Sequence, residues 1–310
     1  MDITVAICTY NGAERVPEVL DHLRAQDHLE DVRWEVIVVD NNSTDGTGDV
    51  VRRYREKTWS RSAPLKVVTE TQQGVAFARQ RAVDEANGEW VAFLDDDNLP
   101  TSDWVAEAVS FAQEHPNAGA FGGQLIGKFE EEPPPSFGLV KGFFALNERE
   151  ETFRYSRNGR GQFAPGAGLV INREAWQRDV SGEVSTTGAS GESRGDPGED
   201  VEAQWFLHEA GWEVWHNADM KAKHKIPADR LREEYLDAFF EGQGRGRHHL
   251  RMVRFEPWQR PFMAAAFWLE DLRKLISLYW RFRDKLDDRF VRARVVMVKT
   301  MLVYPILGDT

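Results

Sequence analysis

Three consecutive aspartates, Asp95, Asp96 and Asp97, follow the apolar run Trp90–Leu94. A short apolar run bounded by turn residues is typical of a buried strand, and open α/β sheets bind their ligands at the carboxyl ends of the strands. An Asp-x-Asp pair can hold Mg²⁺ against a diphosphate, because this ion usually takes one or two protein carboxylates together with phosphate oxygens. The alternative is an acidic turn that caps a helix beginning near Ser102, and the cluster alone does not decide between the two.

The elements around these aspartates alternate between strands and helices. Apolar runs predict strands at residues 3–7, 34–39, 65–68 and 90–94. Apolar residues recur at helical spacing between them, and one predicted helix, residues 74–87, ends at Gly88. This βαβ order favours an α/β fold with a mostly parallel, Rossmann-like sheet that is flanked by helices and joined by right-handed crossovers.

The composition limits the classes of partner. The 310 residues are 41% hydrophobic, enough for one large α/β domain and an appendage. A formal net charge of −12 argues against nucleic acid as a partner, because proteins that bind it present basic patches. The single cysteine, Cys8, lies in an apolar run and is interpreted as a buried core residue. Since a strand is predicted from Ile3, no secretory segment is expected at the start, and a cytoplasmic location is predicted.

Four segments, in order along the chain, resemble the motifs of family 2 glycosyltransferases with the GT-A fold. They are Cys8–Asn11, Val39–Thr47, Gly74–Ala82 and Phe93–Asp97, and the resemblance extends from residue 3 to about residue 230. It implies a nucleotide-diphospho-sugar transferase domain over residues 1–250, with a nucleotide-binding half (1–100) and an acceptor half (101–250). Residues 251–310 are then expected to form a C-terminal helical extension.

The resemblance implies that the first two turns and the third helix bind the donor nucleotide. Asp40, at a sheet edge, can accept hydrogen bonds from a uracil-like base or a ribose, and Thr9 and Tyr10 can contact that base by hydroxyl and ring. The predicted donor-binding residues are Thr9, Tyr10, Asn11, Asp40, Asn42, Arg79, Asp95 and Asp96. Tyr10 could instead be a packed core ring, and Arg79 a solvated helix residue. Arg79 stands in Ala-Arg-Gln where the family has Ala-Arg-Asn, so the role of that asparagine stays open.

In the Asp-x-Asp motif the resemblance assigns the metal to Asp97. It assigns the ribose, or a metal-bound water, to Asp95, with Asp96 as the spacer. The expected cofactor is Mn²⁺ or Mg²⁺, which would act as a Lewis acid on the departing nucleoside diphosphate.

Two basic segments follow downstream. Many GT-A enzymes complete the metal site with a histidine well beyond the aspartates, and His224 occupies a comparable place. An imidazole ligand favours Mn²⁺ over Mg²⁺. The alternatives for His224 are a diphosphate contact or a histidine that merely ends a strand. A flexible basic loop, predicted at residues 242–249, could close over the diphosphate or an anionic acceptor carrier, or could be a hinge.

The second half of the chain has two further segments that resemble the family. Gly166, Ala167 and Gly168 match a segment that lines the sugar and acceptor cleft, although a strand bulge would also explain the glycines. Glu199-Asp200 resembles the motif that carries the general base. The resemblance makes Asp200 the base that deprotonates the acceptor hydroxyl and Glu199 a residue that positions it. The alternative is that both only favour a helix N-terminus. Residues 181–198, just before them, are predicted to be a mobile loop.

Two amphipathic helices are expected near the end of the chain, at residues 261–282 and 290–307. Charged residues interrupt both, so neither is expected to span a membrane. They could pack on the catalytic domain, pair with another subunit, or lie in a membrane interface, where Arg292, Arg294 and Lys299 would meet anionic headgroups.

These observations predict an inverting, metal-dependent glycosyltransferase of polysaccharide biosynthesis. It would move a sugar from a nucleotide-diphosphate sugar to a saccharide or lipid-linked saccharide acceptor, and inversion follows from the resemblance alone. One alternative is a sugar-nucleotide pyrophosphorylase, which would need a Gly-rich, Arg/Lys-bearing loop in place of residues 9–12. Another is a catalytically inactive nucleotide-sugar binding or scaffold protein, which would be expected to lack one of the acidic motifs. Association with the inner face of the cell membrane stays open, and no oligomeric state is predicted.

Overall fold

The computed structural model describes residues 1–60, 63–156, 163–182, 184, 186, 188–190, 193–196, 198–252 and 255–307. These residues fall into two compact units. The first comprises Met1–Lys128, Ala145–Gly191 and Glu199–Lys225, and the second comprises Phe129–Phe144, Glu192–Gly198 and Ile226–Thr310. The predicted domain boundary at residue 250 stays a prediction.

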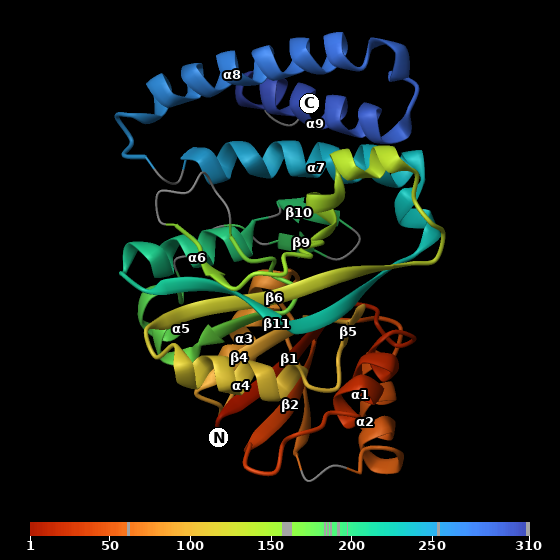
Figure 1. Cartoon of the computed structure of the whole chain (residues 1–310), viewed down its shortest axis with the longest axis vertical. Helices are drawn as coiled ribbons and strands as arrows, with labels where there is room; N and C mark the ends of the chain where they lie inside the picture. Colours follow the sequence, from red (N-terminus) through yellow and green to blue (C-terminus); the bar gives the residue numbers. More distant parts are fainter. Residues whose placement is uncertain are drawn as a thin grey trace. The chain divides into compact units, whose positions relative to one another are not determined.

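Four parallel strands form the N-terminal part of the central sheet (Figure 1). They are β1 (Ile3–Thr9), β2 (Trp34–Asp40), β3 (Leu65–Thr69) and β4 (Trp90–Asp95), in the order β3-β2-β1-β4. The helices between them are α1 (Val16–Arg24), α2 (Thr47–Lys57) and α3 (Val75–Glu85). The predicted strands and their βαβ order are therefore confirmed, and each strand runs slightly past its predicted end.

The second half of the chain adds antiparallel strands to this sheet. β8 (Leu169–Asn172) pairs with β4 and with β6 (Ala118–Phe129), and β11 (Glu213–Ile226) pairs with β5 (Asn98–Pro100) and β7 (Phe153–Arg154). In the described part of the chain these strands make one nine-stranded sheet, ordered β3-β2-β1-β4-β8-β6-β11-β5 with β7 beside β11. The parallel half is thus extended by an antiparallel half.

Further helices and short strands lie between residues 104 and 209. They are α4 (Trp104–Glu114), α5 (Arg173–Asp179), β9 (Gly188–Ser190), β10 (Ser193–Asp196) and α6 (Glu199–Glu209). β9 and β10 lie within residues 181–198, so the segment predicted as a mobile loop contains secondary structure.

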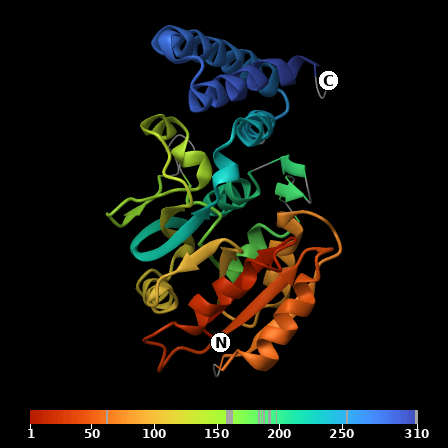
Figure 2. The same ribbon diagram turned by 90° about the vertical axis from the view of Figure 1, so that its right-hand side faces the viewer.

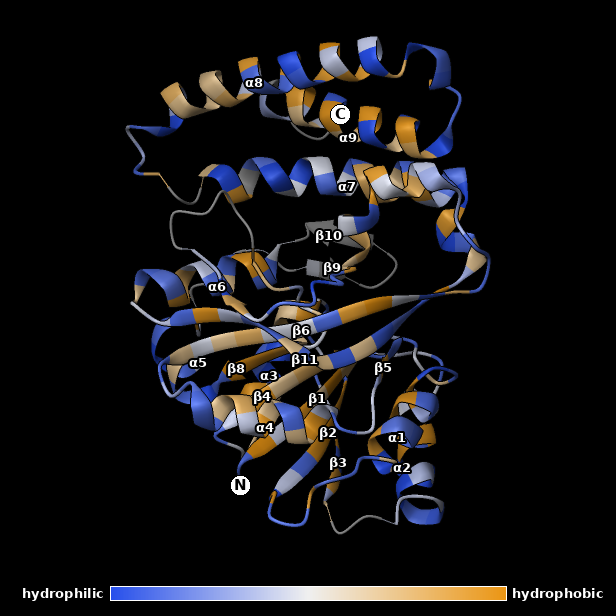
Figure 3. Cartoon of the chain, viewed as in Figure 1, coloured by the Kyte–Doolittle hydropathy of each residue, from blue (hydrophilic) through white to orange (hydrophobic). Residues whose placement is uncertain are grey.

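Helices cover both faces of the sheet, and all seven residues of β1 are buried. Side chains alternate along a strand, so Ile3, Val5 and Ile7 join an apolar cluster with α1 and α4 on one face. Ala6 and Cys8 join a cluster with α3 and α5 on the other. Burial on both faces explains why the strands read as continuous apolar runs, whereas the flanking helices mix hydrophobic and hydrophilic residues (Figure 3).

The second unit is built mainly from helices. They are η1 (Pro135–Leu139), η2 (Lys141–Phe144), η3 (Ala228–Leu231), α7 (Glu233–Met252), α8 (Arg260–Arg281), η4 (Arg283–Lys285) and α9 (Arg289–Leu307). α9 packs against both α7 and α8, and the three lie side by side in both views (Figure 1 and Figure 2). The two predicted C-terminal helices are confirmed as α8 and α9. Among the helices of the described residues, none has the length and apolar content that crossing a membrane requires.

The prediction of a flexible loop at residues 242–249 is wrong, because these residues lie within α7. One of the glycines that suggested a loop, Gly244, serves helix packing instead. A Cβ on Gly244 would lie 2.7 Å from Cβ of Thr300 and 2.8 Å from the carbonyl oxygen of Met297 in α9. The missing side chain lets the two helices approach closely, and this packing outweighs the low helix propensity of glycine.

Candidate functional site

The three aspartates lie where β4 ends and β5 begins. β4 closes at Asp95, β5 opens at Asn98, and α4 starts only at Trp104, so the aspartates do not cap that helix. The side chain of Asn98 holds the turn by accepting a hydrogen bond from the backbone N–H of Asp95 at 3.0 Å. Burial raises the pKa of Asp95 to about 6, against the opposing charge of Arg79.

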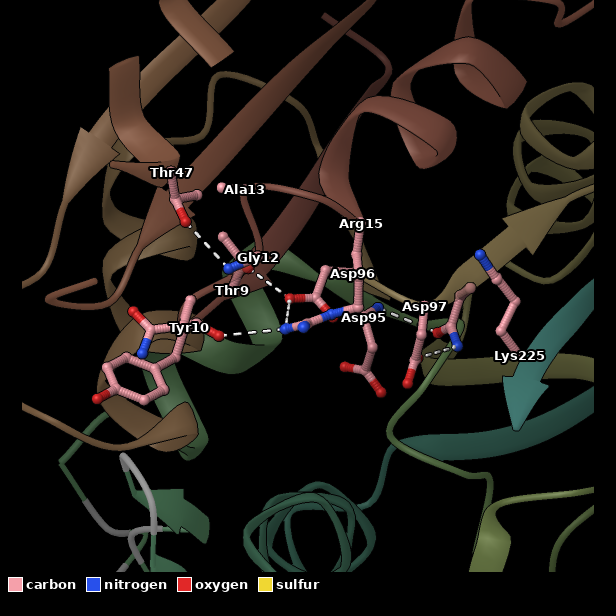
Figure 4. A network of polar contacts seen from close by, with 12 residues as sticks. Thr9, Tyr10, Gly12, Ala13, Arg15, Thr47, Asp95, Asp96, Asp97 and Lys225 are labelled. Carbon is pink, nitrogen blue, oxygen red and sulfur yellow. Dashed lines mark hydrogen bonds and ion pairs between the residues drawn. The ribbon is translucent and has the colours of Figure 1, made fainter. Parts of the chain in front are cut away.

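Asp96 points into a polar network with the first turn (Figure 4). Arg15 donates two hydrogen bonds to its carboxylate, both at 2.9 Å, and Thr9 Oγ1 donates a third at 2.5 Å. Arg15 also donates to the carbonyl oxygen of Tyr10 at 3.2 Å. Asp96 therefore ties the aspartate turn to the β1–α1 turn. Sequence reasoning missed Arg15, because an arginine before a helix carries no signal of a partner so distant in the chain.

Asp97 and His224 are brought together by the pairing of β5 with β11. In that antiparallel register His224 lies opposite Asn98, and Lys225 N–H donates to the carbonyl oxygen of Asp97 at 2.9 Å. His224 Nε2 lies 3.4 Å from Asp97 Oδ2, and both side chains are buried. The structure thus brings together the carboxylate and the imidazole that were predicted as metal ligands.

The donor set of Asp97 and His224 fits Mn²⁺ better than Mg²⁺, because it combines a carboxylate with an imidazole. No group of three or more His, Cys, Asp or Glu side chains suited to a metal occurs in the described residues. Two protein ligands are nevertheless enough for an ion whose other ligands are diphosphate oxygens and water. The residues present therefore fit a metal that binds together with a nucleotide.

Asp40 and Thr9 end neighbouring parallel strands and lie opposite each other in the register. The Asp40 carboxylate is buried and accepts a hydrogen bond from the backbone N–H of Ser43 at 3.0 Å. The next residue, Asn41, was not predicted as a site residue. Its Oδ1 accepts from the backbone N–H of Gly74 at 2.8 Å, so it fixes the start of α3 against the end of β2.

Asn11 and Asn42 shape the turns after β1 and β2. Both have positive φ angles, 49° and 63°, in the left-handed region that asparagine tolerates better than most residues. Asn11 Oδ1 accepts from the backbone N–H of Thr44 at 2.8 Å and so joins the two turns. Asn42 is exposed, and Tyr10 is half-buried rather than packed fully in the core.

Arg79 is a buried residue of α3, so its interpretation as a solvated helix residue is wrong. Its Nη1 donates to Glu199 Oε1 at 2.9 Å, and its guanidinium lies 5.5 Å from the centre of the Phe93 ring. Burial disfavours the charged form of this side chain. Glu199, Asp95 and Asp200 nevertheless outweigh burial and raise the pKa of the guanidinium.

Gly166 packs directly against Asp200. A Cβ on Gly166 would lie 2.8 Å from Asp200 Oδ2 and 2.7 Å from Arg79 Nη2, so no other residue fits without a shift. Gly166, Ala167 and Gly168 precede β8, and Gly168 has a φ of 76°. The glycines thus form a turn before the strand, and the alternative of a bulge within a strand is wrong.

Gln204 of α6 holds this glycine turn in place, and it was not predicted. Its amide accepts a hydrogen bond from the N–H of Ala164 and donates one to the carbonyl oxygen of the same residue, both at 2.9 Å. It also donates to the carbonyl oxygen of Asp200 at 3.0 Å. A buried glutamine on a helix gives no signal in the sequence that it clamps a distant backbone segment.

The structure therefore assembles two groups of predicted residues within the first unit. Asp97 and His224 form one, and Arg79, Glu199, Asp200 and Gly166 form the other. Asp95 links the two groups, because its charge interacts with Arg79, Asp97 and His224.

The family match covers more than half of the chain: a sequence model described as "Glycosyl transferase family 2" matches residues 4–176. Over 125 residues the chain is 34% identical to the putative teichuronic acid biosynthesis glycosyltransferase TuaG of Bacillus subtilis, which covers 40% of this chain and 47% of TuaG. Over 115 residues it is 33% identical to the poly(ribitol-phosphate) beta-N-acetylglucosaminyltransferase TarS of Staphylococcus aureus, covering 37% of this chain and 19% of TarS. The matches span less than half the length of these relatives.

Two solved structures share the fold. The mannosyltransferase PcManGT from Pyrobaculum calidifontis, in complex with GDP-Man and Mn²⁺, has a TM-score of 0.59 at 22% identity and covers 99% of this chain and 88% of its own. Residues 1–349 of S. aureus TarS in complex with UDP-GlcNAc give 0.54 at 17% identity, covering 97% and 90%. The predicted GT-A fold is confirmed, and the family match over residues 4–176 shows that the chain belongs to glycosyl transferase family 2.

Proposed function

We propose that the chain is an inverting, metal-dependent glycosyltransferase that moves a sugar from a nucleotide-diphosphate sugar to a saccharide or lipid-linked saccharide in polysaccharide biosynthesis. The observation that carries this proposal is the buried Arg79, which donates to Glu199 Oε1 at 2.9 Å and whose charge also interacts with Asp95 and Asp200. A donor-side carboxylate and an acceptor-side carboxylate thus share one cation. The names of TuaG and TarS support the reaction class.

On the donor side, Thr9, Tyr10 and Asp40 would contact the nucleoside from the ends of β1 and β2. Asp97 and His224 would hold Mn²⁺ or Mg²⁺, and the ion would stabilise the negative charge that grows on the departing diphosphate. PcManGT, a neighbour in fold, was solved with GDP-Man and Mn²⁺, which supports the choice of cofactor.

On the acceptor side, Asp200 is the proposed general base. Its Oδ1 accepts a hydrogen bond from the backbone N–H of Val201 at 2.9 Å, and Gly166 leaves room for close approach to Oδ2. Asp200 would take the proton of the acceptor hydroxyl as the new glycosidic bond forms and the bond to the diphosphate breaks. Glu199 is held at 2.9 Å by Arg79, so we assign it a positioning role.

A donor screen tests the proposal. UDP-, GDP- and dTDP-sugars would each be added with and without Mn²⁺ while the thermal unfolding of the full chain is followed. A ligand that binds only the folded protein stabilises it by roughly 2.7 kcal/mol at a hundredfold excess over its dissociation constant. We expect at least one of these donors to raise Tm only when Mn²⁺ is present. The absence of a shift with every donor would contradict the proposal.

We also infer that α8 contacts an anionic membrane surface, which would place the enzyme in the cytoplasm at the inner face of the membrane. Phe262, Leu269, Ile276 and Trp280 are 61–79% exposed, and their spacing places them on one side of the helix. Large apolar side chains of this kind are enriched where a helix lies in a membrane interface. The exposed cations Arg260 and Arg281, at the two ends of α8, would meet anionic headgroups.

The cations expected to make this contact are engaged within the second unit instead. Arg292 pairs with Asp237 at 2.6 Å and with Glu233 at 3.3 Å. Lys299 lies over the ring of Tyr279 at 5.8 Å. Arg294 lines a cavity among α7, α8 and α9. The membrane contact is therefore assigned to α8 rather than to these residues of α9.

Vesicle binding tests the membrane contact. The double variant Leu269→Glu/Ile276→Glu changes exposed positions only, so folding should survive, while co-sedimentation with phosphatidylglycerol vesicles should fall at least tenfold. Val303→Glu is the matched control, because Val303 is 47% exposed but lies on α9. Equal co-sedimentation of the double variant and the wild type would refute the contact.

A further inference from the structure

A cavity of about 630 Å³ lies among α7, α8 and α9, wholly within the second unit. Four of its lining side chains are cationic: Arg247 from α7, Arg273 and Lys274 from α8, and Arg294 from α9. None of its lining residues is acidic. The volume falls within the range of roughly 300–1,000 Å³ that is typical of small-molecule sites. A strongly basic cavity in a chain with a net charge of −12 calls for a ligand of opposite charge.

Two of these arginines converge on one aromatic ring. Arg247 Cζ lies 5.3 Å and Arg294 Cζ 5.1 Å from the centre of the Phe143 ring. Neither forms an ion pair with a carboxylate in the part of the chain that the structure describes. Arg251, which also lies in α7, differs from them because it pairs with Asp271 at 2.5 Å. Of the four lining cations, Lys274 pairs with Glu270 at 2.8 Å and lies 3.6 Å from Asp271. The cavity thus concentrates three arginine charges that no ion pair among the described residues balances.

The pKa values of both arginines lie below the usual value of a guanidinium group. Loss of hydration, followed by the charge of Arg294, lowers the pKa of Arg247. Burial lowers the pKa of Arg294 as well. Arg247 is exposed and Arg294 half-buried, so solvent screens this repulsion in part, and an anion bound in the cavity would relieve the rest.

The other lining residues restrict the kind of anion. Leu278, Met297 and Met301 form an apolar wall beside the cations, and Ser277 adds a hydroxyl donor. Arginine forks match phosphate oxygens, and several cations around one group favour a multiply charged anion over a single carboxylate. A purely inorganic ion would make no favourable contact with the apolar wall. It fits a ligand with a hydrocarbon part.

We propose that this cavity binds an anionic amphiphile, with its phosphate group between Arg247, Arg273 and Arg294 and its apolar chain against Leu278, Met297 and Met301. The proposal does not depend on the transferase reaction, because every residue in it belongs to the second unit and none to the candidate active site.

Three probes separate the possible sources of the phosphate. Binding of dihexanoyl phosphatidic acid, inorganic phosphate and the neutral dihexanoylglycerol to the full chain would be measured by calorimetry below micellar concentrations. We expect the phosphatidic acid to bind at least tenfold more tightly than inorganic phosphate, and the neutral lipid not to bind. Equal binding of phosphatidic acid and inorganic phosphate would overturn the amphiphile, and binding of the neutral lipid would overturn the role of the cations.

Variants then locate the site. Arg247→Gln/Arg294→Gln should weaken phosphatidic acid binding at least tenfold. Its Tm without ligand should equal or exceed that of the wild type, because a repulsion is relieved. Arg247→Lys/Arg294→Lys keeps the charges and should retain most of the binding. A glutamine variant that lost stability and kept its affinity would mean that the arginines serve the fold and not a ligand.

Arg273 provides a second route that leaves both arginine contacts with the Phe143 ring intact. Arg273 lines the cavity and is exposed, so Arg273→Glu should abolish binding in a folded protein. Arg283→Gln is the matched control, because this exposed arginine follows α8 outside the cavity. Wild-type affinity in Arg273→Glu, or an equal loss in Arg283→Gln, would overturn the assignment.

Discussion

The acidic sheet edge of the first unit and the basic cavity of the second unit handle charge in opposite ways. At the sheet edge, Arg15 lies 2.9 Å from the carboxylate of Asp96, and Arg79 lies 2.9 Å from that of Glu199. In the cavity, Arg247 and Arg294 both lie over the ring of Phe143. Neither pairs with a carboxylate of the described residues. Arginines pair with carboxylates in the first region, whereas these two arginines of the second region are proposed to meet a ligand.

This difference separates residues that hold geometry from residues that meet a ligand. Asp96 and Glu199 are fixed by arginines of their own unit before any ligand arrives, which preorganises the edge. Asp200 is in neither ion pair, and its carboxylate is only partly buried. Neighbouring carboxylates in one site therefore have separable roles, and substitutions at each should produce different losses.

The largest effect is expected from Asp200→Asn. Transfer should fall by about 10²–10⁴-fold, the usual contribution of a general base, while donor affinity stays near that of the wild type. Initial rates and donor titration on the same preparation would measure this. Glu174→Gln is the matched control, because Glu174 also lies in the first turn of a helix, α5. Similar losses in both variants would mean that Asp200 only favours its helix electrostatically.

Asp97→Asn should remove metal-dependent nucleotide binding while the fold survives. A hard divalent cation needs an anionic oxygen ligand, and the substitution would leave His224 as the remaining one of the two proposed metal ligands. Titration calorimetry with Mn²⁺ and a nucleoside diphosphate should show affinity weaker by at least tenfold. Asp103→Asn, in the turn before α4, should bind as the wild type does. Unchanged Mn²⁺ dependence in Asp97→Asn would remove this residue from the metal site.

Asp96→Asn should act on stability more than on metal binding, in contrast to Asp97→Asn. Its carboxylate accepts hydrogen bonds from Arg15 and Thr9, but Arg15 is 44% exposed, so solvent weakens the pair. We expect a loss of about 1–2 kcal/mol in the free energy of unfolding. Urea denaturation of Asp96→Asn, Arg15→Ala and the double variant would measure the coupling. If the losses of the two single variants simply add up in the double variant, the interaction between Arg15 and Asp96 does not contribute to stability.

The smallest effect is expected in the second unit, from Gly244→Ala. Alanine favours a helix by about 1 kcal/mol over glycine, yet its Cβ would meet Thr300 and the Met297 carbonyl. The clash of the added Cβ should outweigh the gain in helix propensity. We therefore expect the free energy of unfolding in denaturant to fall by about 1 kcal/mol. Gly142→Ala is the control, because no atom lies within 4 Å of a Cβ there. Stabilisation by Gly244→Ala would show that the α7–α9 contact is loose.

The parallel half of the fold could be predicted from the sequence because its signal is local. Continuous apolar runs that end in polar turns indicated both that the strands are buried and where they end. All four strands were found where expected. The antiparallel half could not be predicted in this way. β11 is half polar along its length, and two of its partners, β5 and β7, are too short to produce a periodic pattern.

The same division holds within the candidate site. The resemblance to the family motifs singled out Asp97, Arg79 and Asp200, each of which the structure places in one of the two groups of the first unit. Spacing gave no indication of Arg15, Asn41 or Gln204, because their hydrogen-bond partners lie far away in the chain.

The sequence by itself determined the order of the strands and helices along the first half of the chain, because this order depends on local hydrophobic periodicity and on turn residues. It also determined the chemical types of the residues at the strand ends. Only the tertiary structure decided what those residues face. The pairing of β11 with β5 places His224 beside Asp97. The close contact of α7 with α9 turns a glycine-rich segment into a helix, because the space between two backbones is a property of the packed helices and not of either sequence segment.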